Sequence, residues 1–199
     1  DGTFNDVIQY VTIDTTGNAT DFGNLSVARV HGTATSSTTR GIFASGAIAG
    51  NTTNVIDYIT IGSTGNASDF GDLSTTREQG LDGRGSNGTR GVFCGGSSKQ
   101  TPNAGSDNPQ NIIEYVTIDS TGNATDFGDL SGVRLLTAAV VGGDRLLVTG
   151  GSSTENATNG VNTMEFITIT STGNATDFGD LGTAKVEMAG TSDSHGGLA

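Results

Sequence analysis

The chain has 199 residues, of which 32 are Gly, 21 are Asp or Glu, 9 are Lys or Arg and one is Cys, and its formal net charge is −12. This acidic excess argues against a nucleic-acid partner, which needs clustered Lys and Arg, and against docking on an anionic membrane. The hydrophobic fraction is only 33%, and the abundant Gly, Thr, Ser and Asn disfavour helix interiors. We therefore expect a single all-β domain.

Two further classes are disfavoured by the chain as a whole. No apolar run approaches the roughly 18 residues that a membrane-spanning helix needs, so no membrane insertion is expected. Cys94 is the single cysteine, so no disulfide can form within the chain.

The first predicted element is an apolar, β-branched run at residues 7–13, which is followed by the phrase GNATDFGNL at residues 17–25. Run and phrase recur together, with later copies of the phrase beginning at residues 65, 122 and 173. Repeats about 50 residues long predict supersecondary units that bury their faces on one another, as in propellers, solenoids or arrays.

One repeat can be divided into four strands. In the last complete copy we expect strand a at 133–141, strand b at 145–151, strand c at 163–169 and a short outer strand d at 175–181. Four short strands joined by Gly- and Asn-rich turns match the blade of a β-propeller. No segment carries the apolar stripe of an amphipathic helix.

The order of strands sets the expected domain organisation. We expect one repeat domain over residues 1–199, which begins with an outer half-blade and ends with an inner half-blade. The units are 1–25, 26–73, 74–130, 131–181 and 182–199. The two halves are predicted to combine into a fourth blade and to close a four-bladed ring. The alternative is that they pair with neighbouring copies in a larger propeller or a filament, because unpaired strand edges recruit other chains.

Two side chains recur at fixed places in each unit. The Phe of the phrase is expected to cover the seam between adjacent blades. A base four residues after the phrase's Leu is expected to begin strand a of the next blade and to form a structural ion pair. These positions are Phe22, Phe70, Phe127 and Phe178, and Arg29, Arg77, Arg134 and Lys185.

These features together resemble the kelch repeat. The residues that carry the resemblance are Gly95-Gly96, Glu114-Tyr115, and Phe127 with Leu130 and Arg134. Phe stands where kelch repeats usually carry Trp. The segment STGNATDFGDL is more similar to kelch-like repeats in predicted tail-fibre and other virion proteins of marine bacteriophages, especially cyanophages. The resemblance implies a β-propeller with a structural role outside cells or on a virion.

No catalytic group, metal or cofactor is predicted. Every unit carries nearly the same acidic pair, such as Asp126 and Asp129, and this repetition indicates a structural role rather than four active sites. Neither His31 nor His195 has a neighbour at metal-ligand spacing. Calcium is the one alternative, because a turn groups several oxygen ligands. Its weak candidates are Asn66, Asp69 and Asp72.

The expected binding surface is formed by the loops between strands b and c, at 47–53, 97–111 and 152–162, because binding residues concentrate on loops of a regular scaffold. The candidate ligand-binding residues lie in the longest loop: Lys99, Gln100, Asn103, Asp107, Asn108 and Gln110. Four repeat asparagines fit the N-glycosylation motif: Asn18, Asn66, Asn123 and Asn174.

The predicted function is that of a noncatalytic structural or adhesive propeller module in an extracellular or virion-surface assembly. Its expected partners are surface glycans or other fibre subunits, with a homo-oligomer or filament as the assembly. Two alternatives remain open: a polysaccharide-active propeller enzyme, and an intracellular kelch-type interaction scaffold. The enzyme would need a unique residue cluster in the central channel.

Overall fold

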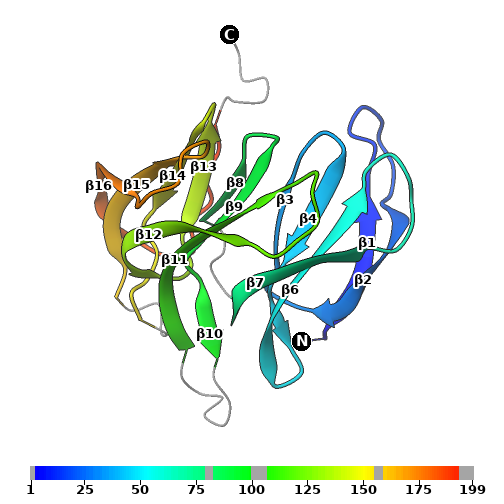
Figure 1. Ribbon diagram of the computed structural model, residues 1–199, viewed down its shortest axis with the longest axis horizontal. Helices are drawn as coiled ribbons and strands as arrows, with labels where there is room; N and C mark the ends of the chain where they lie inside the picture. Colours follow the sequence, from blue (N-terminus) through cyan, green and yellow to red (C-terminus); the bar gives the residue numbers. More distant parts are fainter. Residues whose placement is uncertain (1–2, 79–82, 100–106, 155–158, 193–199) are drawn as a thin grey trace.

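The computed structural model describes residues 3–78, 83–99, 107–154 and 159–192 (Figure 1). Within these ranges the chain forms sixteen β-strands and no helix, which confirms the predicted all-β class. It follows that the described residues include no helix able to cross a bilayer. The strands form four antiparallel sheets, numbered here in chain order.

Sheet 1 is a hairpin, and sheets 2 to 4 are four-stranded meanders in which each strand pairs with the next. Sheet 1 contains β1 (Asn5–Tyr10) and β2 (Thr20–Arg29). Sheet 2 contains β3 (Thr33–Ser36), β4 (Arg40–Ala44), β6 (Asn51–Thr60) and β7 (Ser68–Arg77), with β5 (Ala47–Ile48) beside β6.

Sheets 3 and 4 follow the same order. Sheet 3 contains β8 (Gly83–Ser86), β9 (Arg90–Cys94), β11 (Asp107–Thr117) and β12 (Thr125–Arg134), with β10 (Ser97–Lys99) beside β11. Sheet 4 contains β13 (Ala138–Gly142), β14 (Arg145–Thr149), β15 (Val161–Thr168) and β16 (Thr176–Lys185). The four-strand unit expected from the repeat is therefore present three times.

The core lies between sheets, because the apolar residues of each inner strand face a neighbouring sheet. One buried cluster joins sheets 2 and 3: Ile42, Ala44, Ile56, Phe70, Leu73, Phe93, Val116 and Ile118. The other joins sheets 3 and 4: Val92, Cys94, Ile113, Phe127, Leu130, Leu146, Val148, Ile167 and Ile169. Sheet 3 is covered on both faces, so all of the β9 residues from Gly91 to Cys94 are buried. Continuous burial of this kind is expected for a strand with both faces covered.

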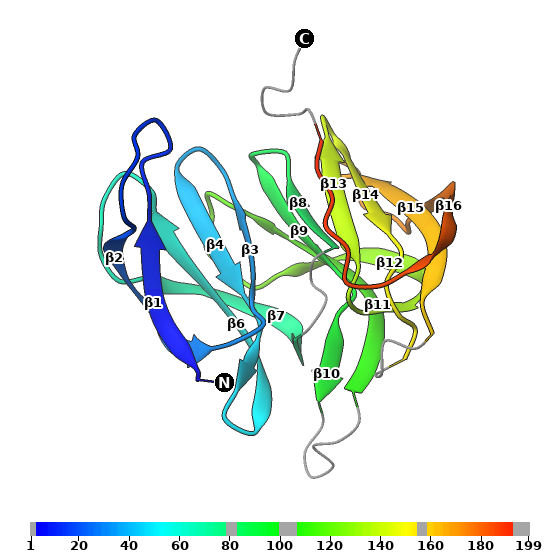
Figure 2. The same ribbon diagram turned by 180° about the vertical axis from the view of Figure 1, so that it is seen from behind.

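The sheets stand one beside the next in chain order, and the strand a–strand b turns all point to one end of the molecule (Figures 1 and 2). At the opposite end lies the β10–β11 hairpin. Sheet 1 and strand β16 lie on opposite sides of the molecule in both views. The expected closure of the two chain ends into one ring is therefore not present in the described residues. Sheet 1 is hydrogen-bonded to sheet 2, as between the Gly65 amide and the Phe22 carbonyl. The segment after β16 lies beside sheet 4, where the Glu187 amide donates to the Leu136 carbonyl and the Ser192 hydroxyl donates to the Val141 carbonyl of β13.

Two local predictions were wrong. The outer strand does not stop at the phrase's Leu but continues to the base, so Arg134 ends β12 instead of beginning the next strand. Strand a accordingly begins at Ala138, not at residue 133. The expected unit limits after residues 25, 73, 130 and 181 thus fall inside β2, β7, β12 and β16. The ladder with the neighbouring strand continues through two register shifts in each of these pairs, and backbone pairing favours this extension.

Where the expected long loop at 97–111 is described, it belongs to a hairpin in which Ser97–Lys99 pair with residues 107–109. The expected loop at 47–53 is likewise a short hairpin between β5 and β6. In both places the chain satisfies its backbone groups by extending the sheet instead of leaving an irregular loop.

Candidate functional site

The same contact joins each sheet to the next, and it is built from the turn of the repeated phrase. The Gly65 amide donates to the Phe22 carbonyl over 2.7 Å, and the Ala67 amide donates to the Asn24 carbonyl over 2.8 Å. The Asn66 side-chain oxygen accepts the Asn24 amide over 3.1 Å. The Gly-Asn-Ala turn of one sheet is thus hydrogen-bonded to the outer strand of the sheet before it.

Two more junctions repeat this geometry. Gly122 and Ala124 donate to Phe70 and Asp72, and Gly173 and Ala175 donate to Phe127 and Asp129, at 2.7 and 2.8 Å each time. The side-chain oxygens of Asn123 and Asn174 accept the amides of Asp72 and Asp129 at 3.1 Å. We call these three hydrogen bonds the turn contact.

The turn contact requires glycine in the outer strand. Gly71 has φ +145°, and a Cβ at this position would lie 2.5 Å from the backbone of Gly122 in the next sheet. Gly23 and Gly128 show the same approach, with a Cβ 2.2 and 2.5 Å from the next turn. This close approach explains the Gly of the repeated Asp-Phe-Gly triplet.

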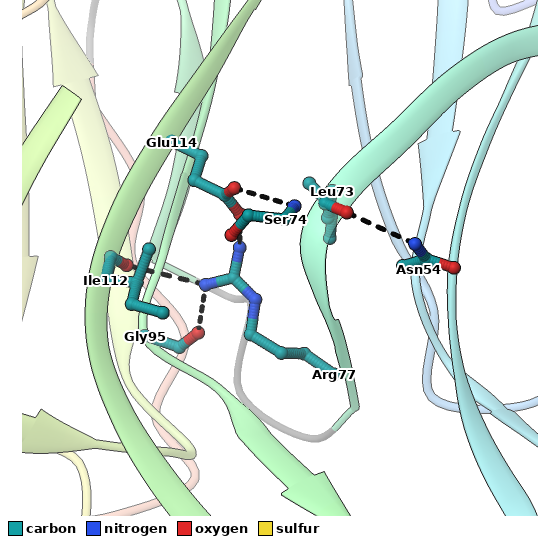
Figure 3. A network of polar contacts seen from close by, with 7 residues as sticks. All are labelled: Asn54, Leu73, Ser74, Arg77, Gly95, Ile112 and Glu114. Atoms are coloured by element: carbon teal, nitrogen blue, oxygen red, sulfur yellow. Dashed lines mark hydrogen bonds and ion pairs between the residues drawn. The ribbon is translucent and has the colours of Figure 1, made fainter. Parts of the chain in front are cut away.

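A buried ion pair accompanies each turn contact (Figure 3). Arg77 at the end of β7 donates from Nη2 to Glu114 Oε2 in sheet 3, and both side chains are almost fully buried. The other Glu114 oxygen accepts the Ser74 amide over 2.8 Å, and Arg77 Nη1 donates to the Gly95 carbonyl over 2.9 Å. Burial lowers the pKa of Arg77 from its ordinary value, and the Glu114 carboxylate opposes that shift.

Equivalent buried pairs stand at the other two junctions: Arg29 with Asp57, and Arg134 with Glu165. The predicted structural ion pairs are therefore confirmed for three of the four bases. Lys185, the fourth, is exposed and makes no ion pair with the described residues. Among the described residues no sheet packs against β16 on this side, so no strand c acid lies opposite Lys185.

The acid of each pair was not identified from the sequence. It lies within strand c, flanked by apolar residues, and not among the Asp residues of the repeated phrase. The usable signal was the charged residue inside each buried run, at Asp57, Glu114 and Glu165, because a charge there must be paired.

A second row of bases between sheets was also missed. Arg40 lies 4.6 Å from the Tyr58 ring centre and donates to the Ile118 carbonyl over 2.9 Å. Arg90 repeats this with Tyr115 and with the Ile169 carbonyl, at 4.3 and 3.0 Å. Each base follows a Thr at the start of strand b, so its regular place in the repeat was available as a signal.

The prediction for the repeated Phe holds at three positions and fails at one. Phe22, Phe70 and Phe127 are 7%, 3% and 3% exposed between sheets. Phe178 is 54% exposed, because none of the described sheets packs on that side of sheet 4. Each of the four rings makes an edge contact with an aromatic ring in strand c, as Phe178 does with Phe166 at 6.2 Å.

The predicted ligand-binding residues are only partly described. Gln100 and Asn103 lie outside the described residues, and the backbones of Lys99 and Asp107 pair in the β10–β11 hairpin. Asn108 is exposed, and its carbonyl accepts Gln110 Nε2 over 2.8 Å. This hairpin stays a predicted binding surface.

One of the calcium candidates already has a hydrogen-bond partner. The Asn66 side-chain oxygen already accepts a backbone amide in the turn contact. Among the described residues no three His, Cys, Asp or Glu side chains cluster in a way that could hold a metal ion. The four glycosylation candidates, Asn18, Asn66, Asn123 and Asn174, are all exposed.

A groove of about 600 Å³ opens at the end of the molecule that carries the strand a–strand b turns. Its walls come from β3, β8, β13 and the segment after β16, so it lies where the inner strands of sheets 2 to 4 meet. Hydroxyl groups line it: Thr35, Ser36, Ser37, Thr38, Ser86, Thr191 and Ser192. The remaining described lining residues are Gly, Ala and Val, and none of the lining residues that the structure describes is ionisable.

Cys94 is fully buried in the core between sheets 3 and 4, as expected for a packed thiol. Burial raises its pKa to about 12. The thiol is therefore neutral at physiological pH and poorly suited to act as a nucleophile.

Comparison with known proteins gives no family assignment: no protein-family model matches the sequence, and no curated protein matches it.

Proposed function

We propose that the chain is a noncatalytic structural and adhesive module, built as part of a kelch-like β-propeller and working outside cells or on the surface of a virion. The observation that carries this proposal is the junction that recurs three times with the same hydrogen bonds and a buried ion pair. A junction that recurs with the same contacts is suited to a structural scaffold.

The propeller part of the proposal rests on how the inner strands meet. A Cβ on Gly85 of β8 would lie 2.3 Å from Val141 of β13, and one on Gly91 of β9 would lie 2.7 Å from Thr35 of β3. The inner strands of neighbouring sheets are thus crowded together. Blades arranged around a common axis have this geometry.

The adhesive part rests on the groove at this axis. Hydroxyl groups can donate and accept hydrogen bonds, and a neutral sugar presents the same groups. General acid–base catalysis needs a carboxyl, imidazole or similar group near the reacting atoms. The described lining residues offer none, so they favour binding of a neutral glycan over its cleavage.

Binding of neutral oligosaccharides, measured on a glycan array and then by titration, tests the adhesive function. Thr38→Trp places a bulky ring at the groove from an exposed turn, and Asn108→Trp places one on the opposite end of the molecule. Loss of binding in Thr38→Trp alone supports the groove. Loss in Asn108→Trp alone moves the site to the β10–β11 hairpin. Absence of glycan binding in the unmodified chain leaves only the structural role.

A further inference from the structure

Arg84 is the one Arg of the chain that has no counterpart in another sheet. The other six Arg residues fall into two repeated sets. Three end outer strands and form the buried ion pairs, and three begin strand b and lie over an aromatic ring: Arg29, Arg77 and Arg134, and Arg40, Arg90 and Arg145. A base that the repeated scaffold requires is expected in every sheet, so the scaffold does not account for Arg84.

The register of the sheets shows which residues replace Arg84 elsewhere. Arg84 of β8 lies opposite Phe93 of strand b. In sheets 2 and 4 the residues opposite the same position of strand b are Ala34 and Ala139. Strand a therefore carries a small side chain at this place in two sheets and a long cation in the third.

Arg84 lines a cavity of about 280 Å³ that lies between β8, β13 and the segment after β16. The segment after β16 is held against β13 (Figure 2), since the Ser192 hydroxyl donates to the Val141 carbonyl over 2.6 Å. Arg84 is the one charged side chain among the described lining residues. The others are Ala138, Ala139, Met188, Ala189 and Gly190.

This cavity adjoins the hydroxyl-lined groove. Ala139 and Gly190 belong to the lining of both, so a ligand in the groove can extend into the cavity. The described lining of the groove supplies hydroxyl groups without charge, and the cavity supplies a guanidinium. Together they present a neutral polar surface next to a single positive charge.

A guanidinium has five N–H donors in a planar fork, which fits a carboxylate with two parallel hydrogen bonds. Such charge-assisted bonds are stronger than those between neutral groups. Five donors also allow the half-buried Arg84 to hold a ligand while it keeps a contact within the chain. The net charge of −12 repels a polyanion from the surface, so a ligand with one acidic group and an otherwise neutral structure is favoured.

We propose that the groove and the Arg84 cavity bind a glycan that carries a single carboxylate, with neutral sugar units in the groove and the carboxylate on Arg84. This inference rests on the proposed adhesive function, because it uses the same groove. It adds the chemical class of the glycan, which contains one uronic acid or another carboxylated sugar. The charge of Arg84 selects this class over a wholly neutral glycan.

Titration with glucuronate, followed by amide shifts in ¹H–¹⁵N NMR spectra, tests this inference. The methyl ester of glucuronic acid is the matched neutral probe, because it keeps the sugar ring and loses the charge. We expect glucuronate to bind at least about tenfold more tightly than the ester and to shift the amides of Ala139 and Gly190. Arg84→Gln is expected to remove this difference in affinity, and Arg84→Lys to keep part of it.

Two further variants separate the cavity from general effects of charge and folding. Lys185→Gln removes the same charge from an exposed residue of the outer strand and should leave both affinities unchanged. Ala189→Glu adds a carboxylate at the cavity from an exposed position and should weaken glucuronate binding at least about tenfold, with binding of the ester unchanged. Circular dichroism establishes that each variant is folded. If Arg84→Gln does not fold, Ala189→Glu takes its place.

The inference is overturned if glucuronate binds no more tightly than the ester, if its advantage survives Arg84→Gln or Ala189→Glu, or if Lys185→Gln removes it equally. These outcomes differ from a failure of the proposed function. If neutral glycans bind in the groove and glucuronate has no advantage, the adhesive function stands and only the carboxylate site is lost. If glucuronate binds through Arg84 and no neutral glycan binds, the carboxylate site stands and the groove loses its role.

Discussion

Neutralising Glu114 should show how strongly a buried ion pair holds two sheets together. Glu114→Gln keeps the shape of the side chain but leaves the Arg77 guanidinium buried without a counter-charge, and Arg77 is fully buried. Breaking a buried pair in this way costs about 3–5 kcal/mol of unfolding free energy. For a chain of this length about 1 kcal/mol changes Tm by roughly 2–4 °C, so we expect Tm to fall by roughly 6–20 °C.

Thermal and urea unfolding followed by circular dichroism measure this loss. A double variant, Arg77→Met with Glu114→Leu, removes both charges and should recover most of the lost stability. Lys185→Met is the control, because the same base in sheet 4 is exposed and should change stability by no more than about 0.5 kcal/mol. A loss below about 1 kcal/mol in Glu114→Gln, or an equal loss in Lys185→Met, would refute the role given to the buried pair.

Three further predictions compare internal positions with the end of the chain or with the unfolded state. Gly71→Ala and Gly179→Ala share a positive φ, but only the first meets a neighbouring turn, so urea unfolding should show Gly71→Ala to be less stable by about 1–3 kcal/mol. Phe127→Ala should cost about 3–5 kcal/mol of unfolding free energy, and Phe178→Ala about 1 kcal/mol or less; equal costs would contradict the burial of Phe127 between sheets. The raised pKa of Cys94 means that the folded state retains a proton that the unfolded state loses, so stability should fall by about 1.4 kcal/mol per pH unit between about pH 9 and pH 12. The same pH series on Cys94→Ala should lack this component.

Much of the architecture could be predicted because the repeat is regular at every level. The apolar runs, the Thr-Gly-Asn turns and the roughly 50-residue period all favour the same four-stranded unit, and consistency between local and global signals is what makes a fold predictable. The position of Phe127 between sheets follows from the same regularity. The outer strands were predicted too short because the base after the phrase was assigned to the next strand, whereas in the structure the outer strand continues to that base.

The sequence does not predict that residues at the same position of the repeat have different environments. Phe127 and Phe178 occupy the same position of nearly identical repeats, yet Phe127 is 3% exposed and Phe178 is 54% exposed. Arg134 and Lys185 differ in the same way. Their environments depend on whether another sheet packs against them. This packing is set by the arrangement of all the sheets, which a local sequence pattern does not contain.

Because each sheet is stabilised by its neighbours, residues that depart from the repeat are the better candidates for function. In a quasi-one-dimensional array each unit is stabilised by contacts with the units on either side, so residues that recur at every internal junction are accounted for by stability. Gln9 and Lys185 stand where the internal junctions carry an acid and an Arg, and both side chains are exposed. A charge buried without a counter-charge is costly. The charged pairs are therefore found where two sheets bury them together, and the unpaired Lys185 stays in solvent.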